Sequence, residues 1–519
     1  MKDVETLKAD FIINNIDMAF YAWENAPWHE EISFDAFCQY ILPYRFDREL
    51  LVNGWRDSLY NRYHPFIQNA KSAKEAFEII YNITGEQYTS SSSEFPFILD
   101  AVAMLHQKDF SCMQRTVLIG SIMRALGIPV AIDCVNSWAN YSTNGHTWIA
   151  FVAKDGIYSI YEEEKEAKKF NRIDASRFTI ENVIDENYPF DIHFQKRVAK
   201  ISRITYEKNH EDDILYPFSI DVSAEYGLTN KIDIQSDSKS DDAYTYLCTF
   251  RTGKDFEPCC YAKNKNGVAH FNNLGDTVLY LPMTMRSHQL VPIGHPFILT
   301  KDNARHLVPN KEQTQTIVLT RKYPLTGKFI NDWAGMIGNT FEASNDSDFS
   351  TKEVLCTVYR TPVFQNQYKI NNGQKYQFIR YVSNNTAPMA EIKIYGESGE
   401  IKLNNKTSTI ANAERTIDNN TETRANAEIG YIEYELSLPQ KITSIEFFPK
   451  NDGNFILPGH EYELLYFDDK WESIGKQVAD NYTIRFENVP TNSLLLLKDL
   501  SGGHEERPFE YKDGKQIWW

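Results

Sequence analysis

Apolar residues recur at helical spacing in the first quarter of the chain. The segments with this pattern are residues 7–24, 71–83 and 111–126. The last segment is the clearest, because Leu118, Ile122 and Leu126 form one i, i+4 row. Gly127 follows directly as a C-terminal stop signal. We therefore predict a helix over residues 111–126.

Short apolar runs replace the helical pattern after this point. The first runs are residues 130–135, 147–152 and 157–161, each typical of a strand. From about residue 201 the chain alternates apolar and polar positions in short segments bounded by Gly, Asn, Asp and Pro. These segments include residues 244–250, 278–281, 316–319, 376–382, 390–395, 429–436, 442–447, 462–466 and 493–497. Short strands with regular turn signals favour β-sandwich structure.

The fold class that follows is a multidomain α+β protein, with an N-terminal α+β domain and β-sandwich domains after it. The 519 residues suffice for about three or four domains. The predicted units are an α+β domain over residues 1–205, a β-sandwich over 206–326, a β segment over 327–397 and a further β-sandwich over 398–519. No low-complexity linker separates them, so we expect the units to pack against one another.

Charge and composition exclude several partners. The formal net charge is -17 and no stripe of Lys and Arg occurs, which excludes a nucleic-acid-binding footprint. No run of about 18 apolar residues occurs, so we expect no membrane span. The seven cysteines form no CxxC pair and no metal spacing, so we expect no disulfide framework.

Candidate chemistry is concentrated between Cys112 and Glu162. Cys112 lies in the first turn of the predicted helix, where free backbone N–H groups and the helix dipole stabilise a thiolate. His146 opens a predicted strand and can accept the thiol proton. Glu162 ends the next predicted strand, and two antiparallel strands would return it beside His146 to orient the ring. Glu162 begins a run of three glutamates, so Glu163 and Glu164 remain alternatives.

This order of residues carries a family resemblance. The residues concerned are Cys112, the turn Arg124-Ala125-Leu126-Gly127-Ile128-Pro129 and the strand start Gly145-His146-Thr147-Trp148. Together they resemble the transglutaminase-like superfamily, which has a papain-like Cys–His core. The resemblance implies that Cys112 is the nucleophile, His146 the general base and Glu162 the acid that orients the base. It also implies that Trp138 and Trp148 line the substrate site, with a core aromatic role as the alternative for Trp138.

Two positions depart from the family pattern. The acid is usually Asp, and Tyr158 stands where the family has Trp. The segments LPYRFDRE (42–49) and GWR (54–56) resemble those of a bacterial subgroup of this superfamily. Their Arg45, Glu49 and Arg56 suggest either a buried ion network or a substrate-binding rim, and we favour the structural role.

A second resemblance lies in the C-terminal part of the chain. It rests on residues 416–423, 431–436, 442–449 and 488–497, with a partial further copy at 338–349, 377–382 and 390–396. These resemble the discoidin, or coagulation factor 5/8 type C, family of galactose-binding-like jelly-roll sandwiches. The resemblance implies glycan binding through loops and a calcium site at Asp418, Asn420 and Thr423, whose oxygens are hard ligands. A plain turn is the alternative. The candidate sugar-binding aromatic residues are Trp471, Trp518 and Trp519, unless they pack inside the structure.

We therefore expect a cysteine-dependent amide hydrolase, a protease or amidase that acts through a thioester on a protein, peptide or glycoprotein. Catalysis by such a site needs no cofactor. Two alternatives stay open: a protein-glutamine acyltransferase, or an inactive glycan-binding protein. The discoidin-like segments favour an extracytoplasmic location, in the periplasm or at the cell surface. The N-terminal residues show no secretory signal, so we expect that segment to have been removed.

Overall fold

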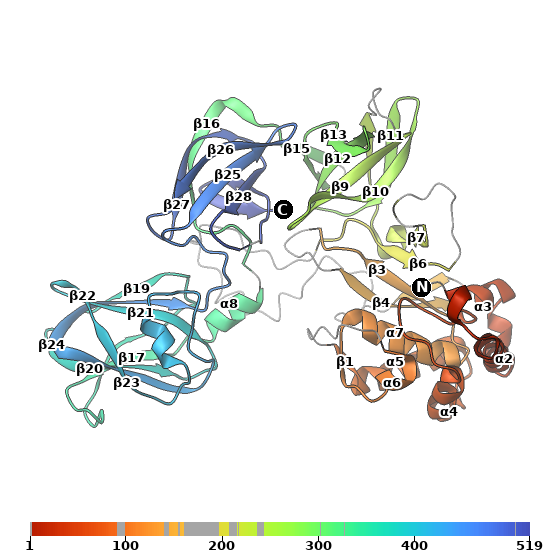
Figure 1. Cartoon of the computed structure of the whole chain (residues 1–519), viewed down its shortest axis with the longest axis horizontal. Coiled ribbons are helices and arrows are strands. Elements are labelled where there is room, and N and C mark those ends of the chain that lie inside the picture. The colour runs from red at the N-terminus through yellow and green to blue at the C-terminus, as the bar shows by residue number, and fades with distance from the viewer. Residues whose placement is uncertain are drawn as a thin grey trace.

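The computed structural model describes residues 3–90, 99–139, 145–153, 156–159, 197–206, 215, 217–235, 243–301, 303–325, 327–503 and 505–519. The protein is mostly β, with a few helices and many antiparallel sheets. Its strands and helices gather into four units that Figure 1 shows side by side. In the part of the chain that the structure describes, no helix has the length and hydropathy needed to cross a membrane.

The N-terminal unit combines a helical layer with a sheet. Its helices are α1 (Asp3–Thr6), α2 (Ala9–Glu24), α3 (Phe34–Tyr40), α4 (Trp55–Ile67), α5 (Ala73–Gln87), α6 (Ala101–Met104) and α7 (Cys112–Ala125). Its antiparallel sheet has the order β5-β4-β3-β6-β7. The strands are β3 (Val130–Val135), β4 (His146–Ala153), β5 (Gly156–Ser159), β6 (Ser202–Ile204) and β7 (Ser219–Asp221). A small parallel pair joins β1 (Thr89–Ser90) to β2 (Asp109–Phe110).

Local signals at both ends fix α7. At its start the Ser111 side chain accepts from the Gln114 backbone N–H at 3.3 Å, and Gln114 Oε1 accepts from the Ser111 N–H at 3.0 Å. This reciprocal capping box satisfies two donors that a helix start leaves free. At its end Gly127 has φ +70°, and a Cβ there would lie 2.7 Å from the Ala22 carbonyl oxygen. The predicted helix 111–126 is confirmed to within one residue at each end.

The second unit is an eight-stranded antiparallel sheet. Its order is β15-β14-β12-β9-β10-β11-β8, and β13 also pairs with β12. The strands are β8 (Asn230–Gln235), β9 (Tyr244–Arg251), β10 (Asp255–Lys265), β11 (Val268–Leu274), β12 (Val278–Arg286), β13 (Gln289–Pro292), β14 (Phe297–Thr300) and β15 (Asn303–His306). Alternating apolar residues of these strands form two buried clusters, as the sequence pattern predicts.

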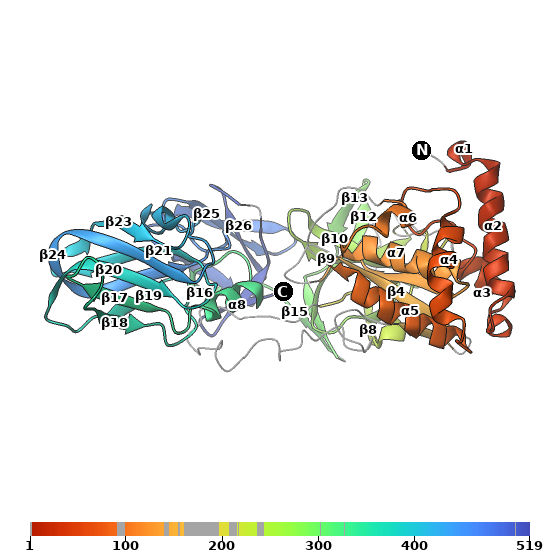
Figure 2. The same ribbon diagram turned by 90° about the horizontal axis from the view of Figure 1, so that it is seen from below.

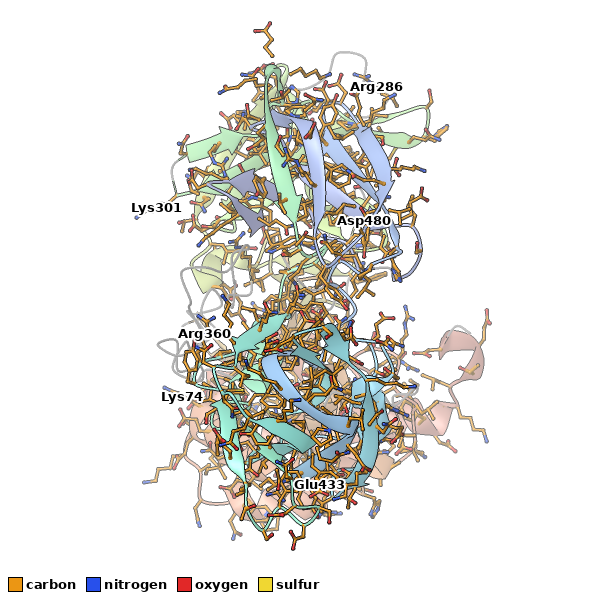
Figure 3. The ribbon with its side chains drawn as sticks, turned by 90° about the vertical axis from the view of Figure 1, so that its left-hand side faces the viewer. Lys74, Arg286, Lys301, Arg360, Glu433 and Asp480 are labelled. Atoms are coloured by element: carbon orange, nitrogen blue, oxygen red, sulfur yellow. The ribbon has the colours of Figure 1, made fainter. Side chains whose placement is uncertain are left out.

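The remaining two units are nested in the sequence. One contains β16 (Asn310–Leu319), β25 (Glu461–Phe467), β26 (Trp471–Val478), β27 (Ile484–Thr491), β28 (Leu495–Asp499), β29 (Phe509–Lys512) and β30 (Lys515–Trp518). The other contains α8 (Gly327–Ala334), β17 (Thr340–Ser344), β18 (Glu353–Thr357), β19 (Asn366–Lys369), β20 (Lys375–Ser383), β21 (Met389–Gly396), β22 (Gly399–Ile401), β23 (Leu403–Ser408) and β24 (Gly430–Pro449). Figure 3 shows this β17–β24 unit nearest the viewer, with Arg360 and Glu433 among its labelled residues.

The strand pairing corrects the predicted domain boundaries. The boundary predicted between 397 and 398 divides one sheet system, because β24 pairs with both β20 and β21. The boundary predicted at 326 separates β16 from β27, although these two strands pair from Asn310–Thr491 to Leu319–Ile484. The β17–β24 unit is therefore inserted into the unit that β16 begins. Strand patterns are local, whereas the choice of partner strand depends on residues more than 150 positions away.

The second unit and the unit that contains β16 and β25–β30 share a buried core, as the absence of linkers predicts. Leu281 and Tyr246 lie in one buried cluster with Leu494 and Trp519. At the rim of this contact Arg305 forms a two-bond ion pair with Glu510, at 2.6 and 2.7 Å. Figure 2 shows the resulting elongated molecule, with the helical layer and β24 at opposite ends.

Candidate functional site

Cys112 is the first residue of α7 and is half-buried and free of disulfide bonds. The rest of α7 is buried from Gln114 to Ala125, so the helix is a fixed central element and only its first turn meets solvent. Helical geometry leaves the N–H groups of the first turn without intrahelical partners. The thiol therefore stands at the positive end of a rigid helix dipole.

His146 is brought to the same region by β4. The Thr116 hydroxyl, one turn after Cys112, donates to the Thr147 carbonyl at 3.2 Å. Thr147 directly follows His146, so this buried hydrogen bond fixes the start of β4 beside the second turn of α7. Further along β4, Ile149 and Phe151 pack in the same core as α7. The sequence-predicted pair therefore lies on two elements that are held directly against each other.

The His146 ring lies near two tryptophans, with its plane roughly parallel to both indoles. Its centroid is 6.2 Å from that of Trp138 and 5.8 Å from that of Trp148, with interplanar angles of 22° and 24°. Trp138 and Trp148 are only 4% and 0% exposed, so neither presents an open face to a substrate. Their burial agrees with the core aromatic alternative for Trp138, and the substrate-binding role of both residues stays a prediction.

The described residues include two members of the predicted triad, Cys112 and His146. Among the described residues, it records no hydrogen bond between the Cys112 sulfur and the His146 ring. β4 pairs with β5 as predicted, with Phe151 opposite Tyr158. Glu162, Glu163 and Glu164 lie outside the described residues, so the identity of the third member stays a prediction.

A buried polar chain behind Trp148 was missed by the sequence reasoning. The Trp148 indole N–H donates to the Tyr226 hydroxyl at 2.9 Å, and that hydroxyl donates to Asp133 at 2.5 Å. Arg203 binds both Asp133 oxygens, at 2.7 and 2.8 Å. Burial raises the pKa of Asp133, although the hydrogen bonds from Arg203 and Tyr226 oppose this shift. The one sequence signal was an Asp inside the apolar run VAIDCV, because buried carboxylates need partners.

The charged residues of segments 42–49 and 54–56 make structural contacts, which is the role that the sequence favoured. Arg56 is fully buried and donates to the carbonyls of Ile41 and Arg124, at 2.6 and 2.9 Å. Glu49 accepts from the backbone N–H groups of Phe46 and Asp47, at 2.5 and 2.8 Å. These contacts anchor the loop before α4 onto α7, and Arg45 pairs with Asp3 at 2.9 Å.

The proposed calcium loop follows the short 3₁₀ helix η5 (Ala413–Ile417). Asp418 accepts from the Asn420 backbone N–H at 2.9 Å and from the Thr423 hydroxyl at 2.7 Å. Asn420 in turn accepts from the Glu422 N–H at 3.0 Å. The structure therefore brings the three predicted ligands into one loop, held by bonds that a plain turn also makes.

Glu391 on β21 adds an observation that a plain turn does not explain. It is 2% exposed, and its Oε2 has no hydrogen-bond partner among the described residues. Burial raises its pKa to about 8, Asp418 adds to the shift, and the Asn419 N–H opposes it. A calcium ion between Glu391 and the loop would supply the missing positive charge with oxygen ligands only. No group of three or more His, Cys, Asp or Glu side chains in the described ranges is placed to hold a metal, so carbonyl and hydroxyl oxygens would have to contribute.

Two of the candidate sugar-binding tryptophans pack inside the structure, and the third, Trp471, is half-buried. Trp518 and Trp519 are 2% and 8% exposed, and Trp519 Nε1 donates to Glu510 at 2.8 Å. Trp471 donates to Asp255 of the second unit at 3.0 Å. Burial therefore favours the structural alternative for Trp518 and Trp519, whereas the sugar-binding role of Trp471 stays a prediction.

Comparisons with known proteins add little to this geometry. No family model matches the chain, and no curated protein sequence matches it. Among solved structures, a transglutaminase from red sea bream is similar at 8% identity, over 90% of this chain and 72% of that chain, with a TM-score of 0.20. A TM-score this low shows no common fold and carries no argument about activity. The function of this chain therefore has to be inferred from its own residues.

Proposed function

We propose that the chain is a cysteine-dependent amide hydrolase of the transglutaminase-like type. Cys112 is the nucleophile, His146 the general base and Glu162 the residue that orients His146. The observation that carries the proposal is the Thr116–Thr147 hydrogen bond, which fixes the first turns of α7 beside the strand that begins at His146. A thiol at a rigid helix start, with an imidazole on the adjoining strand, is the arrangement that thiolate catalysis needs.

The chemistry proceeds in two acyl-transfer steps. His146 takes the Cys112 proton, and the sulfur attacks the amide carbonyl to give a tetrahedral oxyanion. The Cys112 backbone N–H, free at the helix start, is one donor for that oxyanion. Collapse expels the amine, which takes a proton from His146, and leaves a thioester. Water, deprotonated by His146, then attacks the thioester and releases the carboxylic acid and the thiol.

The Sγ–imidazole contact has to form during this cycle. Catalytic hydrogen bonds are often long without substrate and tighten in the reacting complex. The tryptophan pair limits the motion of the His146 ring, so the approach falls mainly to the Cys112 side chain, which is half-buried at the helix start.

Alkylation of the whole chain tests this proposal without knowledge of the substrate. Iodoacetamide should label Cys112 faster than Cys38, a half-buried thiol on α3. His146→Ala should slow labelling of Cys112 by roughly tenfold or more, because the thiolate loses its base. His106→Ala, at an exposed position, is the matched control and should change nothing. Equal labelling of Cys112 and Cys38, unaffected by His146→Ala, would refute the catalytic pair.

The acceptor decides between hydrolysis and acyl transfer. Casein offers both peptide bonds and glutamine side chains, so cleavage and incorporation of a fluorescent primary amine can be measured on one substrate. We expect cleavage without incorporation, and Cys112→Ala should abolish it. Incorporation that exceeds cleavage would assign the protein-glutamine acyltransferase instead. If the unmodified chain shows neither cleavage nor incorporation, and Cys112 is labelled no faster than Cys38, an inactive binding protein is favoured.

The β17–β24 unit carries a second candidate function, calcium binding at the discoidin-like loop. The unpartnered Glu391 oxygen favours it over a plain turn. Isothermal titration with CaCl₂ should give one site that Asp418→Asn weakens. We also propose that this unit directs the enzyme to glycoprotein or cell-surface polymer outside the cytoplasm. Binding of the whole chain to an array of glycans, with and without calcium, tests that role.

A further inference from the structure

Two adjacent cysteines, Cys259 and Cys260, lie close together on β10. In a regular strand neighbouring side chains point to opposite faces. The pairing of β10 with β9 is irregular here, because the register shifts between Pro258 and Cys260. A bulge of this kind inserts an extra residue and re-aims a side chain. As a result the two sulfur atoms are 4.0 Å apart.

The cysteine pair lines a cleft between two units. The cleft has a volume of about 460 Å³ and lies between β6 and β7 of the N-terminal unit and β10 and β11 of the second unit. Lys200 crosses it, with an ion pair to Asp221 and a hydrogen bond to the Asn272 carbonyl at 2.7 Å. The cleft therefore brings solvent to the part of β10 that carries the pair, and both residues are half-buried. Figure 1 shows β6 and β7 directly below the β9–β10 region.

The cysteine pair differs in burial from Cys248, the third cysteine nearby. Cys248 is fully buried behind β10, and burial raises its pKa well above the ordinary value. Cys259 donates to the Leu247 carbonyl at 3.3 Å. Its pKa is also raised, first by the hydrogen bond with Cys260 and then by burial, whereas Lys200 opposes the shift. The Cys259 thiol therefore rests in its neutral form.

We propose that Cys259 and Cys260 form a vicinal dithiol that closes reversibly into a disulfide on the wall of this cleft. The oxidant is a low-molecular-weight disulfide. One cysteine loses its proton and attacks the external S–S bond, which releases one external thiol and leaves a mixed disulfide. The second cysteine loses its proton and attacks that mixed disulfide, which releases the second external thiol. Two S–H bonds are thus replaced by one S–S bond, and the external disulfide is reduced.

The bond is expected to be easily reversed. Adjacent Cα atoms are about 3.8 Å apart across a trans peptide. Ordinary disulfides join Cα atoms about 4.4–6.8 Å apart, and bonds outside that range are more readily reduced. Closure also removes the Cys259 thiol that donates to Leu247, so the shape of the cleft wall follows the redox state.

Peptide mapping of the whole chain tests the proposal. The chain is treated with oxidised glutathione, remaining thiols are alkylated after denaturation, and trypsin is added. Cleavage after Lys254 and Lys263 gives a peptide, residues 255–263, that contains Cys259 and Cys260 and no other cysteine. We expect this peptide to lose two hydrogens, to fall roughly tenfold in alkylation, and to recover on addition of reduced glutathione. Double alkylation throughout, or a stable mixed disulfide without the internal bond, would overturn the proposal.

Two variants identify the partners. Cys260→Ser should hold glutathione on Cys259 and form no internal bond. Cys356→Ser, a half-buried cysteine of the β17–β24 unit, is the matched control and should leave oxidation of the 255–263 peptide unchanged. Should Cys260→Ser fail to fold by circular dichroism, phenylarsine oxide provides the second measurement on the unmodified chain. It bridges two close thiols, so it should protect this peptide from alkylation, and an absence of protection would also count against the proposal.

Discussion

Arg124 and Glu391 are both buried ionisable residues, but their surroundings differ. Arg124, at the end of α7, is 0% exposed and donates to the carbonyls of Pro43 and Arg45, at 3.2 and 2.9 Å. It also donates to the Tyr206 hydroxyl at 2.8 Å. Glu391 is equally enclosed, yet one of its oxygens has no partner in the described part of the chain. The hydrogen bonds of Arg124 hold distant segments together, whereas the open oxygen of Glu391 is the observation behind the proposed calcium site.

The largest effect should come from Arg124→Ala. Removal of the guanidinium leaves several buried carbonyls without donors, so we expect a loss of about 3–5 kcal/mol in the free energy of unfolding. Urea unfolding followed by circular dichroism measures it. Arg485→Ala removes an ion pair that is more than 60% exposed on both sides and should cost less than about 1 kcal/mol. Similar losses for both variants would mean that the buried hydrogen bonds of Arg124 stabilise the protein no more than an exposed ion pair does.

Glu391 gives the next largest effect, and its sign follows from its pKa. The folded pKa of about 8 lies above the unfolded value of about 4.3, so the folded state binds more protons between these limits. Without calcium, stability should therefore fall as the pH rises from about 5 to 8, by up to ~1.4 kcal/mol per pH unit.

Calcium sharpens this prediction. It should raise the melting temperature more at pH 8 than at pH 5, because it replaces the proton on Glu391. Glu391→Gln should remove both the pH slope and the calcium response, while Glu435→Gln, at an exposed position of β24, should keep them. A pH slope that persists in Glu391→Gln would place the titrating group elsewhere.

Tyr226→Phe tests the polar chain behind His146. Loss of one hydroxyl leaves the Trp148 N–H and one Asp133 oxygen without their shared partner, at a cost of about 1–3 kcal/mol. Because Trp148 packs on His146, the alkylation rate of Cys112 should fall as well. Tyr359→Phe, at a side chain 69% exposed, is the control for stability and rate. A loss of stability without any change in alkylation would make the chain purely structural.

The smallest effect is expected at the helix cap. Ser111→Ala removes the acceptor for the Gln114 N–H and should cost about 1 kcal/mol. Ser72→Ala removes the equivalent cap of α5, where Ser72 accepts from the Glu75 N–H. Both variants should lose similar stability in urea, but only Ser111→Ala should alter alkylation of Cys112. An equal effect on alkylation would mean that general loosening, and not the local cap, controls the thiol.

The sequence predicted those parts of the site that depend on neighbouring residues, namely the bounds of its helix and strand. Gly127 marked the end of α7, and the G-H-x-W word marked the start of β4. The faces and contacts of the side chains were not predictable. Trp138 and Trp148 were predicted to line the substrate site, but both are buried, and their rings lie near His146. Asp133 was overlooked because its partners, Arg203 and Tyr226, are 70 and 93 positions away.

The sequence by itself determined the bounds of α7, the strands around it and the β-rich character that follows, because capping and side-chain periodicity act within a few residues. Only the tertiary structure decided that β16 pairs with β27, that Cys259 and Cys260 share one side of a bulged strand, and that Glu391 is enclosed without a full set of partners. Each of these depends on which distant segment packs alongside. The free energy of burial and strand pairing resides in contacts that no local pattern specifies.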